Sequence, residues 1–363
     1  MNTQNIIIDD AVRSVIGARG EVRHATDAVS TSEIRRFGQA IFDDNRIYYD
    51  ANAALASRYR ARVGPGTFFV TCMRPNIPFS DDPLRRIGAN EDSSMPEETR
   101  PYPKGWAEMY SYHAGDEVVL HRLPHEGDRL SSQPVVTDIF GKSGRNGNLA
   151  FYVTRTDYTD QHGVRVGSHE RTLALPERYK EESHGPARPE HGAAETLDPP
   201  PMPAAKPLDL PRVDFEDIHA GDTLTPRAYR LTVPTIVRWA MAIEQSYRRD
   251  HYDHDFATRV LGHANIIGSG LWMLSCRWSY VSHFAGCDGW VWKISHQLRA
   301  RMNVGDTLTA SGTVTALERR ERYGLVQLDV RFTNQNGVVA IPGAASVALP
   351  YRGGPAVPYP FVP

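Results

Sequence analysis

The chain carries two versions of one motif about two hundred residues apart, and this duplication limits what it can fold into. The motif reads Asp43-Asp44-Asn45-Arg46-Ile47-Tyr48-Tyr49-Asp50 in the first half and Ser246-Tyr247-Arg248-Arg249-Asp250-His251-Tyr252-Asp253 in the second. An amphipathic run precedes each version, and its apolar residues recur 202 positions later: Ile34, Phe37, Ala40 and Ile41 match Ile236, Trp239, Ala242 and Ile243. We therefore expect two copies of one folding unit.

The ends of the two halves also correspond. Thr159-Asp160-Gln161-His162-Gly163 matches Thr333-Asn334-Gln335-Asn336-Gly337, with 174 positions between Thr159 and Thr333. Further upstream, Glu126-Gly127-Asp128 matches Val304-Gly305-Asp306. The segments keep their order while their offsets drift, which indicates a duplication with insertions and not a strict repeat.

Length and charge exclude several classes of protein. A chain of 363 residues is long enough for two domains with separate cores. A net charge of −2 gives no electrostatic basis for binding nucleic acid or an anionic membrane. No apolar run approaches the ~18 residues of a membrane span, and the N-terminus has no signal-peptide core. Three cysteines without metal-type spacing favour a reducing compartment, so we expect a cytoplasmic protein.

Composition places the boundaries between the parts. Residues 179–211 are rich in Pro, Glu and Ala, which suits an extended linker and cannot build a core. We therefore expect a first domain over 1–178, a second over 212–353 and a tail over 354–363. Residues 75–105 form an irregular segment in the first half, which we interpret as a surface insertion, either simple loop variation or a lid.

The second half shows the secondary structure most clearly. The pattern predicts a strand over 222–231, a helical region over 234–247, a strongly apolar central helix over 270–284, and strands over 290–302, 306–317, 325–333 and 338–349. One apolar helix with long antiparallel strands indicates an α+β domain whose sheet wraps around that helix. Two such units could pair edge to edge into a continuous sheet, which removes two exposed strand edges.

Together these motifs resemble the double hot-dog MaoC-like (R)-specific enoyl-thioester hydratases and dehydratases, and the first half resembles that family's N-terminal domain, related to the dehydratase region of fatty-acid synthase. The family motif is Asp-x-Asn-Pro-x-His-x-Asp. The first half keeps Asp43, Asn45 and Asp50 but has Tyr48 where the catalytic histidine stands. The resemblance implies two hot-dog domains that form an intramolecular pseudo-dimer.

The second half keeps the histidine of the motif. His251 and Asp253 match, while Ser246 stands where the family has its catalytic aspartate. This version is closer to a sub-branch that reads Asn-x-His-Arg-x-His-Tyr-Asp, which Arg249, His251, Tyr252 and Asp253 match. The resemblance implies catalysis in the second half, and contact with substrate for Arg249, Tyr252, Asn45 and Tyr48.

The implied reaction is the reversible hydration of a 2-enoyl-CoA to a 3-hydroxyacyl-CoA. The partner is an acyl-CoA or acyl-carrier-protein thioester, coenzyme A enters only as part of the substrate, and neither a metal nor a redox cofactor is expected. We also expect a homo-oligomer or pairing with a second hot-dog subunit. Three alternatives remain: a non-catalytic subunit of a hydratase, an acyl-CoA binding protein and a thioesterase. Residues 270–284 lack the carboxylate that a hot-dog thioesterase uses, which counts against the last.

Each motif residue has a chemical role to test. His251 is the only member of either version that titrates near pH 7, so it is the candidate proton-transfer group. Ser246 could bond the water but could not act as its base. Asp253 either orients the His251 ring or satisfies the local backbone, and Asp43 is either catalytic or a loop cap. Tyr48 is interpreted as a pocket wall.

The segment Gly268-Ser269-Gly270 aligns with the backbone that binds the thioester carbonyl in the family. Its glycines would let a ligand approach the N–H groups at the start of the central helix, or they are simply helix-entry residues. In the first half, Gly64-Pro65-Gly66-Thr67 is the poorer site because Pro65 lacks an N–H donor. His113 and His296 are interpreted as strand histidines with satisfied hydrogen bonds, and Asp43 and His251 are expected to lie in separate sites.

Overall fold

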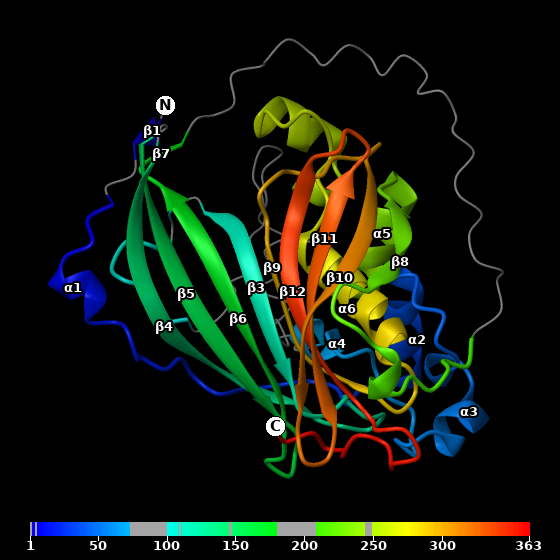
Figure 1. The fold of residues 1–363 in the computed structure, drawn as a ribbon. Helices are drawn as coiled ribbons and strands as arrows, with labels where there is room; N and C mark the ends of the chain where they lie inside the picture. Colours follow the sequence, from blue (N-terminus) through cyan, green and yellow to red (C-terminus); the bar gives the residue numbers. More distant parts are fainter. Residues whose placement is uncertain are drawn as a thin grey trace.

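Ten antiparallel strands form one sheet that runs through both halves of the chain. The computed structural model describes residues 2–3, 6–72, 100–107, 109, 111–144, 147–179, 208–243 and 249–363. The strand order is β2-β4-β5-β6-β3-β9-β12-β11-β10-β8, so the first half supplies five neighbouring strands and the second half the other five (Figure 1). In the first half the strands are β2 (Arg23–His24), β3 (Tyr112–Leu120), β4 (Ser131–Gly144), β5 (Gly147–Thr159) and β6 (Arg165–Pro176).

The second half repeats this arrangement in mirror order around the centre of the sheet. Its strands are β8 (Thr223–Arg230), β9 (Trp290–Gln297), β10 (Thr307–Arg319), β11 (Gly324–Asn334) and β12 (Val339–Leu349). A separate two-stranded sheet pairs β1 (Asn2–Thr3) with β7 (Arg178–Tyr179). The two halves meet where β3 pairs with β9, from Gly115 opposite Gln297 to Val119 opposite Lys293. The predicted edge-to-edge pairing is confirmed.

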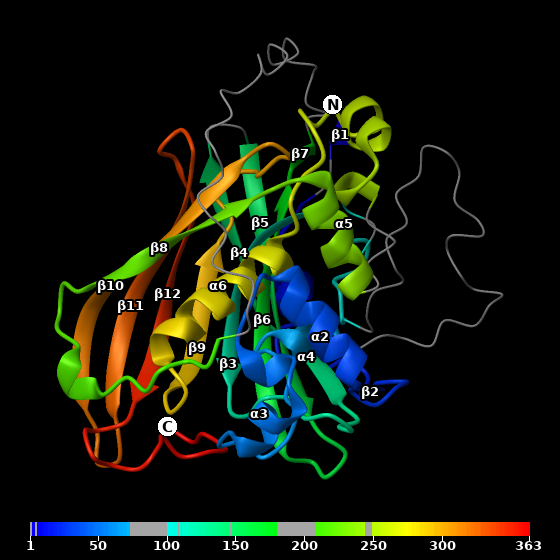
Figure 2. The same ribbon diagram turned by 90° about the vertical axis from the view of Figure 1, so that its right-hand side faces the viewer.

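Most of the helices cover one face of this sheet. The α-helices are α1 (Asp10–Arg13), α2 (Thr31–Ala40), α3 (Ala51–Ala56), α4 (Phe68–Thr71), α5 (Val233–Ala242) and α6 (Gly270–Ala285). Short helical turns are η1 (Arg46–Tyr48), η3 (Phe215–Asp217), η4 (Arg249–His251) and the π-helical η5 (Phe256–Val260). Figure 2 shows α2, α4, α5 and α6 against the same face of the sheet.

The duplication is visible in local structure as well as in topology. Helices α2 and α5 pack together, with the ring centroids of Phe37 and Trp239 5.4 Å apart. The corresponding turns are built alike: Asp128 accepts the His125 N–H at 2.7 Å, and Asp306 accepts the Asn303 N–H at 2.8 Å. In both turns the glycine before the aspartate has positive φ, which glycine adopts without a steric penalty.

Helix α6 is the central helix of the second half, as its apolar composition predicts. Nearly all of its residues are buried, including Trp272, Cys276 and Trp278, and it packs against β9 and β12. It also contacts the first half, where the Trp272 indole donates to the Ala40 carbonyl at 2.9 Å. At the corresponding place in the first half, the described residues form the four-residue α4. The predicted α+β hot-dog architecture is confirmed.

Two predicted elements are shorter than expected. The strand predicted to reach Met302 ends at Gln297, where the regular pairing stops: the N–H groups of Arg299 and Ala300 both bond one carbonyl, that of Ala340 in β12. Helix α5 ends at Ala242, and residues 244–248 lie outside the described residues. Most of the predicted insertion and of the predicted linker (73–99 and 180–207) also lie outside them. Within the part of the chain that the structure describes, none of the helices combines the length and apolar character needed to cross a membrane.

The last ten residues fasten the two halves together. Phe361 is fully buried beside Trp290 and Tyr323, and its N–H donates to the His121 carbonyl at 2.7 Å. Two residues earlier, the Tyr359 hydroxyl lies 2.7 Å from the His125 Nε2. Because His121 and His125 belong to the first half and Trp290 to the second, the tail stabilises their relative position.

We expect Phe361→Ala to lower the free energy of unfolding by about 3–5 kcal/mol, the cost of removing a fully buried phenylalanine. The neighbouring Val362 is 77% exposed, so Val362→Ala is the control and should change stability by less than about 0.5 kcal/mol. Urea unfolding of the three proteins measures both values. Equal stability of the two variants would show that the tail does not anchor the halves.

Candidate active site

The imidazole of His251 is held at the start of the central helix. His251 ends η4, its side chain is 12% exposed, and its Nδ1 lies 3.0 Å from the Ile267 carbonyl oxygen. A carbonyl can only accept, so Nδ1 carries the hydrogen and the neutral ring has its lone pair on Nε2. Ile267 is three residues before Gly270, where α6 begins. The ring is therefore fixed in tautomer and orientation beside the N-terminus of α6.

The loop that carries His251 is braced by its neighbours in the motif. Asp253 binds the Arg249 guanidinium at 2.7 Å and accepts the Phe256 N–H at 3.0 Å. These contacts lower the pKa of Asp253, the Phe256 N–H most strongly. Two roles were predicted for Asp253, to orient the His251 ring or to satisfy the local backbone. Its contacts fit the second role, because the ring is oriented by the Ile267 carbonyl.

Arg249 takes part in the same brace. Besides its ion pair with Asp253, its guanidinium carbon lies 4.3 Å from the centroid of the Phe256 ring. A cation above an aromatic face is a favourable contact, so the side chain is held at two points. The contact with substrate that the resemblance implies for Arg249 stays a prediction.

The first half repeats this brace without the imidazole. Arg46 binds Asp50 at 2.7 Å, and Asp50 also accepts the Asn52 N–H at 2.8 Å. Asn45 caps η1 by accepting the Ile47 N–H, while its implied contact with substrate stays a prediction. The arginine and the aspartate of the motif therefore support the loop in both halves. The halves differ at the position between these two residues, which is His251 in the second half and Tyr48 in the first.

A carboxylate that the sequence reasoning missed lies beside the His251 ring. Asp250 is 1% exposed, and its Oδ1 is 4.0 Å from the His251 Nδ1. Its carbonyl accepts the Ile267 N–H at 3.1 Å, so it also fastens the loop to the start of α6. An acidic residue next to a candidate catalytic histidine was the available signal. Tyr252 donates its N–H to the Arg249 carbonyl, and Ser246 lies outside the described residues.

The two glycines at the start of α6 are in close contact with other parts of the protein. The Gly268 N–H donates to the Met302 carbonyl at 2.8 Å, which removes it as a donor to a ligand. A Cβ on Gly270 would lie 2.7 Å from both the His113 Nδ1 and the Leu298 Cδ1. Ser269 is the N-cap and makes no side-chain cap bond. The donors that remain at this helix end are the N–H groups of its first turn, which have no intrahelical acceptor.

The corresponding place in the first half is filled. Tyr48, at the position of His251, is 2% exposed, and burial raises the pKa of its phenol well above the usual value. A Cβ on Gly66 would lie 2.5 Å from the Trp278 ring, which projects from α6 into the first half. Tyr48 is thus a buried wall, and Trp278 occupies the space beside Gly66.

Asp43 and His251 lie near opposite ends of α6. Asp43 is 1% exposed; its Oδ1 accepts the Asn45 N–H at 3.1 Å and lies 3.2 Å from the His283 Nε2. His283 is thirteen residues after Gly270, which corresponds to about 20 Å along the helix at ~1.5 Å per residue. The two motif residues therefore do not share a site, and the Asn45 contact gives Asp43 the capping role.

One group of described residues has the composition of a metal site. Side-chain atoms of Asp43, Asp44 and His283 all lie within 4.8 Å of one another. The His283 Nε2 already contacts both carboxylates, at 3.2 and 3.3 Å. The two aspartates also act on Arg227, where their charges help raise the pKa of the guanidinium against the effect of burial. The contacts of Asp43, Asp44 and His283 therefore connect the two halves of the chain.

Three histidines surround one buried aspartate where the two halves of the sheet meet. The Asp116 side chain is fully buried on β3, and the Nε2 atoms of His113, His169 and His296 lie 2.8, 2.7 and 2.7 Å from its oxygens. His169 belongs to β6 and His296 to β9, so the cluster joins three strands. His296 is a strand histidine, but only half of its hydrogen-bonding capacity is used: Nε2 bonds Asp116, while the buried Nδ1 has no partner among the described residues. The cluster as a whole was not predicted.

The charge of this cluster is set by burial and by the shared carboxylate. Burial lowers the pKa of His296 to about 4 and also lowers that of His169, so both are neutral near pH 7. Burial alone would raise the pKa of Asp116, but the charge of His113 and the three imidazole donors outweigh it and hold the pKa well below its usual value. Asp116 is therefore an anion inside the protein.

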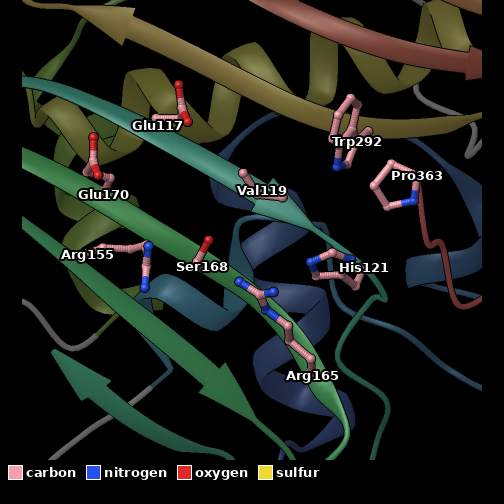
Figure 3. Close-up of a pocket in the computed structure, with 9 residues that line it drawn as sticks. All are labelled: Glu117, Val119, His121, Arg155, Arg165, Ser168, Glu170, Trp292 and Pro363. Carbon is pink, nitrogen blue, oxygen red and sulfur yellow. The ribbon is translucent and has the colours of Figure 1, made fainter. Parts of the chain in front are cut away.

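A cavity of about 290 Å³ lies on the other face of the sheet. Glu117 and Val119 alternate with Asp116 and Val118 along β3, so they point away from α6. Figure 3 shows their side chains with those of Arg155 and Trp292 around the cavity. None of the residues predicted to be functional lines it, and its acidic and basic side chains do not favour one charge of ligand.

Comparisons with known proteins agree with this architecture. Residues 14–168 match the family described as FAS1-like, dehydratase domain region. A solved MaoC-like dehydratase is 18% identical with a TM-score of 0.64, over 94% of this chain and 99% of that one. A putative MaoC domain protein dehydratase from Chloroflexus aurantiacus is 12% identical with a TM-score of 0.60, over 92% and 96%.

A conserved hypothetical protein from Mycobacterium tuberculosis, described as having a double hotdog fold, is 14% identical with a TM-score of 0.56, over 92% of this chain and 96% of that one. Comparison with curated protein sequences gives no match. By its fold the chain is a double hot-dog protein similar to solved MaoC-like dehydratases, and its residues 14–168 match the FAS1-like dehydratase domain region.

The buried histidines predict a pH-dependent stability. The pKa of His296 is 6.5 in an exposed state and about 4 when folded, so the unfolded chain binds a proton more tightly. The free energy of unfolding therefore has its full value above pH 6.5, and it falls by roughly 3 kcal/mol as the pH is lowered towards 4. We expect urea unfolding to show a smaller rise in stability between pH 4 and 6.5 for His296→Gln than for the wild type.

His219 provides the control, because its side chain is 74% exposed. His219→Gln should keep the wild-type pH dependence. An unchanged slope in His296→Gln would mean that this imidazole does not titrate differently in the folded and unfolded chain.

Proposed function

We propose that the protein catalyses the reversible hydration of a 2-enoyl thioester to a 3-hydroxyacyl thioester, with the second half as its active half. The observation that carries this proposal is the position of His251, whose ring is fixed by the Ile267 carbonyl beside the first turn of α6. A titratable imidazole and a set of backbone N–H donors thus occur together, and the reaction needs both.

Each part has a defined task in the proposed reaction. The thioester oxygen accepts from the N–H groups at the start of α6, where the helix dipole also favours negative charge. The Nε2 lone pair of His251 takes a proton from water while the water oxygen bonds to C3. The C2=C3 electrons move towards the thioester oxygen, and a proton is then delivered to C2. No electrons pass to an acceptor, so the reaction itself requires no redox cofactor.

The alternatives differ in what they require of the same residues. A hot-dog thioesterase would use a carboxylate on the central helix, and α6 contains no aspartate or glutamate. A plain acyl-CoA binding protein would not need an imidazole of fixed tautomer. A non-catalytic subunit is the strongest alternative, because the second half lacks the family's motif aspartate and has Ser246 in its place.

We expect the purified protein to consume crotonyl-CoA or a longer 2-enoyl-CoA, followed by the loss of absorbance of the conjugated thioester. His251→Ala should lower kcat by about 10²–10⁴-fold, the usual contribution of a general acid–base group. His254→Ala, on the same loop but with a side chain that is 62% exposed, should keep wild-type turnover. Thermal unfolding of each variant checks that the fold is retained.

The outcomes separate the candidate functions. Turnover that survives His251→Ala would remove the assigned role. Release of free CoA without hydration would indicate a thioesterase, and turnover only after a second hot-dog protein is added would indicate a subunit. Binding of enoyl-CoA that produces no product and is insensitive to His251→Ala would indicate a binding protein.

A further inference from the structure

The imidazole of His113 differs from the other two histidines of the Asp116 cluster in its surroundings. The side chain of His296 is fully buried and that of His169 is 5% exposed, whereas that of His113 is 23% exposed. Its Nε2 edge faces Asp116 at 2.8 Å. Its Nδ1 edge lies against Gly270, the first residue of α6. One histidine of the cluster therefore reaches from the buried carboxylate to the start of the central helix.

His113 comes from the opposite half to His251. It lies on β3 of the first half, while His251 approaches the same helix end through Ile267. Ile267 and Gly270 are three residues apart, and three residues span at most about 11 Å. The two imidazoles therefore flank one short stretch of backbone, which leads into the first turn of α6, where the proposed oxyanion donors lie.

The groups that face His113 come from three strands and from α6. On its own strand, His113 faces Asp116. Strand β6 contributes His169 and Arg171, and the Arg171 Nε lies 3.9 Å from Asp116. Strand β9 contributes His296. Burial keeps His169 and His296 neutral near pH 7 by lowering their pKa values, and the charge of Arg277 on α6 acts in the same direction on His296. The negative charge of Asp116 is thus left to be balanced by its less buried neighbours.

We propose that His113, held by Asp116, is the second proton-transfer group of the active site and donates the proton to C2. This rests on the proposed hydration. His251 removes a proton from water as the O–C3 bond forms, and the His113 Nδ1–H gives its proton to C2 as the enolate electrons form the C2–H bond and the thioester carbonyl is restored. His251 then returns a proton to solvent and His113 takes one up. The first half thereby supplies the group that the second half's motif lacks.

The test compares three proteins with one enoyl-CoA across pH. In the wild type, kcat/KM should fall at both low and high pH, because the proposed reaction needs one group that acts as a base and another that acts as an acid. His113→Gln cannot titrate, so we expect kcat to fall by about 10²–10⁴-fold and the alkaline limb to disappear, while the acidic limb remains.

His169→Gln is the matched control, because His169 makes the same contact with Asp116 but from β6. We expect it to keep both limbs of the pH profile even if its melting temperature falls. Loss of the alkaline limb in both variants, or in neither, would overturn the proposal. If His113→Gln does not fold, the wild-type profile still decides: the absence of an alkaline limb contradicts a proton donor.

The result also separates this inference from the function on which it rests. An inactive wild type would refute both. A wild type that loses turnover with His251→Ala, but keeps its kcat and both pH limbs with His113→Gln, would leave the hydratase function intact and refute the role of His113.

Discussion

The antiparallel pairing of β3 with β9 is the interaction on which the rest of the structure depends. It joins two five-stranded sheets into one and removes an exposed edge from each half. Its register also places Asp116 opposite His296. A slip of one residue would turn one of these side chains to the other face of the sheet, so the same pairing that joins the halves also creates the buried cluster.

Much of the fold could be predicted from the sequence because the signals are local. Matching turns such as Gly127-Asp128 and Gly305-Asp306 specify the same backbone geometry twice, and the apolar run from Gly270 specifies a buried helix. The motif identified His251 as the candidate proton-transfer group, whereas the position of its ring at the start of α6 is known from its contact with Ile267. The roles of its neighbours did not, because Asp253 has Arg249 and the Phe256 N–H as competing partners within a few residues.

The histidine cluster shows where sequence reasoning ends. Residues three apart on a regular strand point to opposite faces, so His113 and Asp116 would not be expected to meet. A register shift between His113 and Gly115 changes this alternation and brings both to the same face. The remaining members, His169 and His296, are far away in the sequence and meet Asp116 only through strand pairing.

The Trp278 ring beside Gly66 breaks the twofold relation between the halves. An assembly of two identical hot-dog units has two equivalent sites, whereas here an indole from α6 packs against Gly66 in the first half only. The proposed chemistry then has a stoichiometry of one acyl group per chain. On that proposal saturation would follow a simple hyperbola, and any cooperativity would arise between separate chains and not within one.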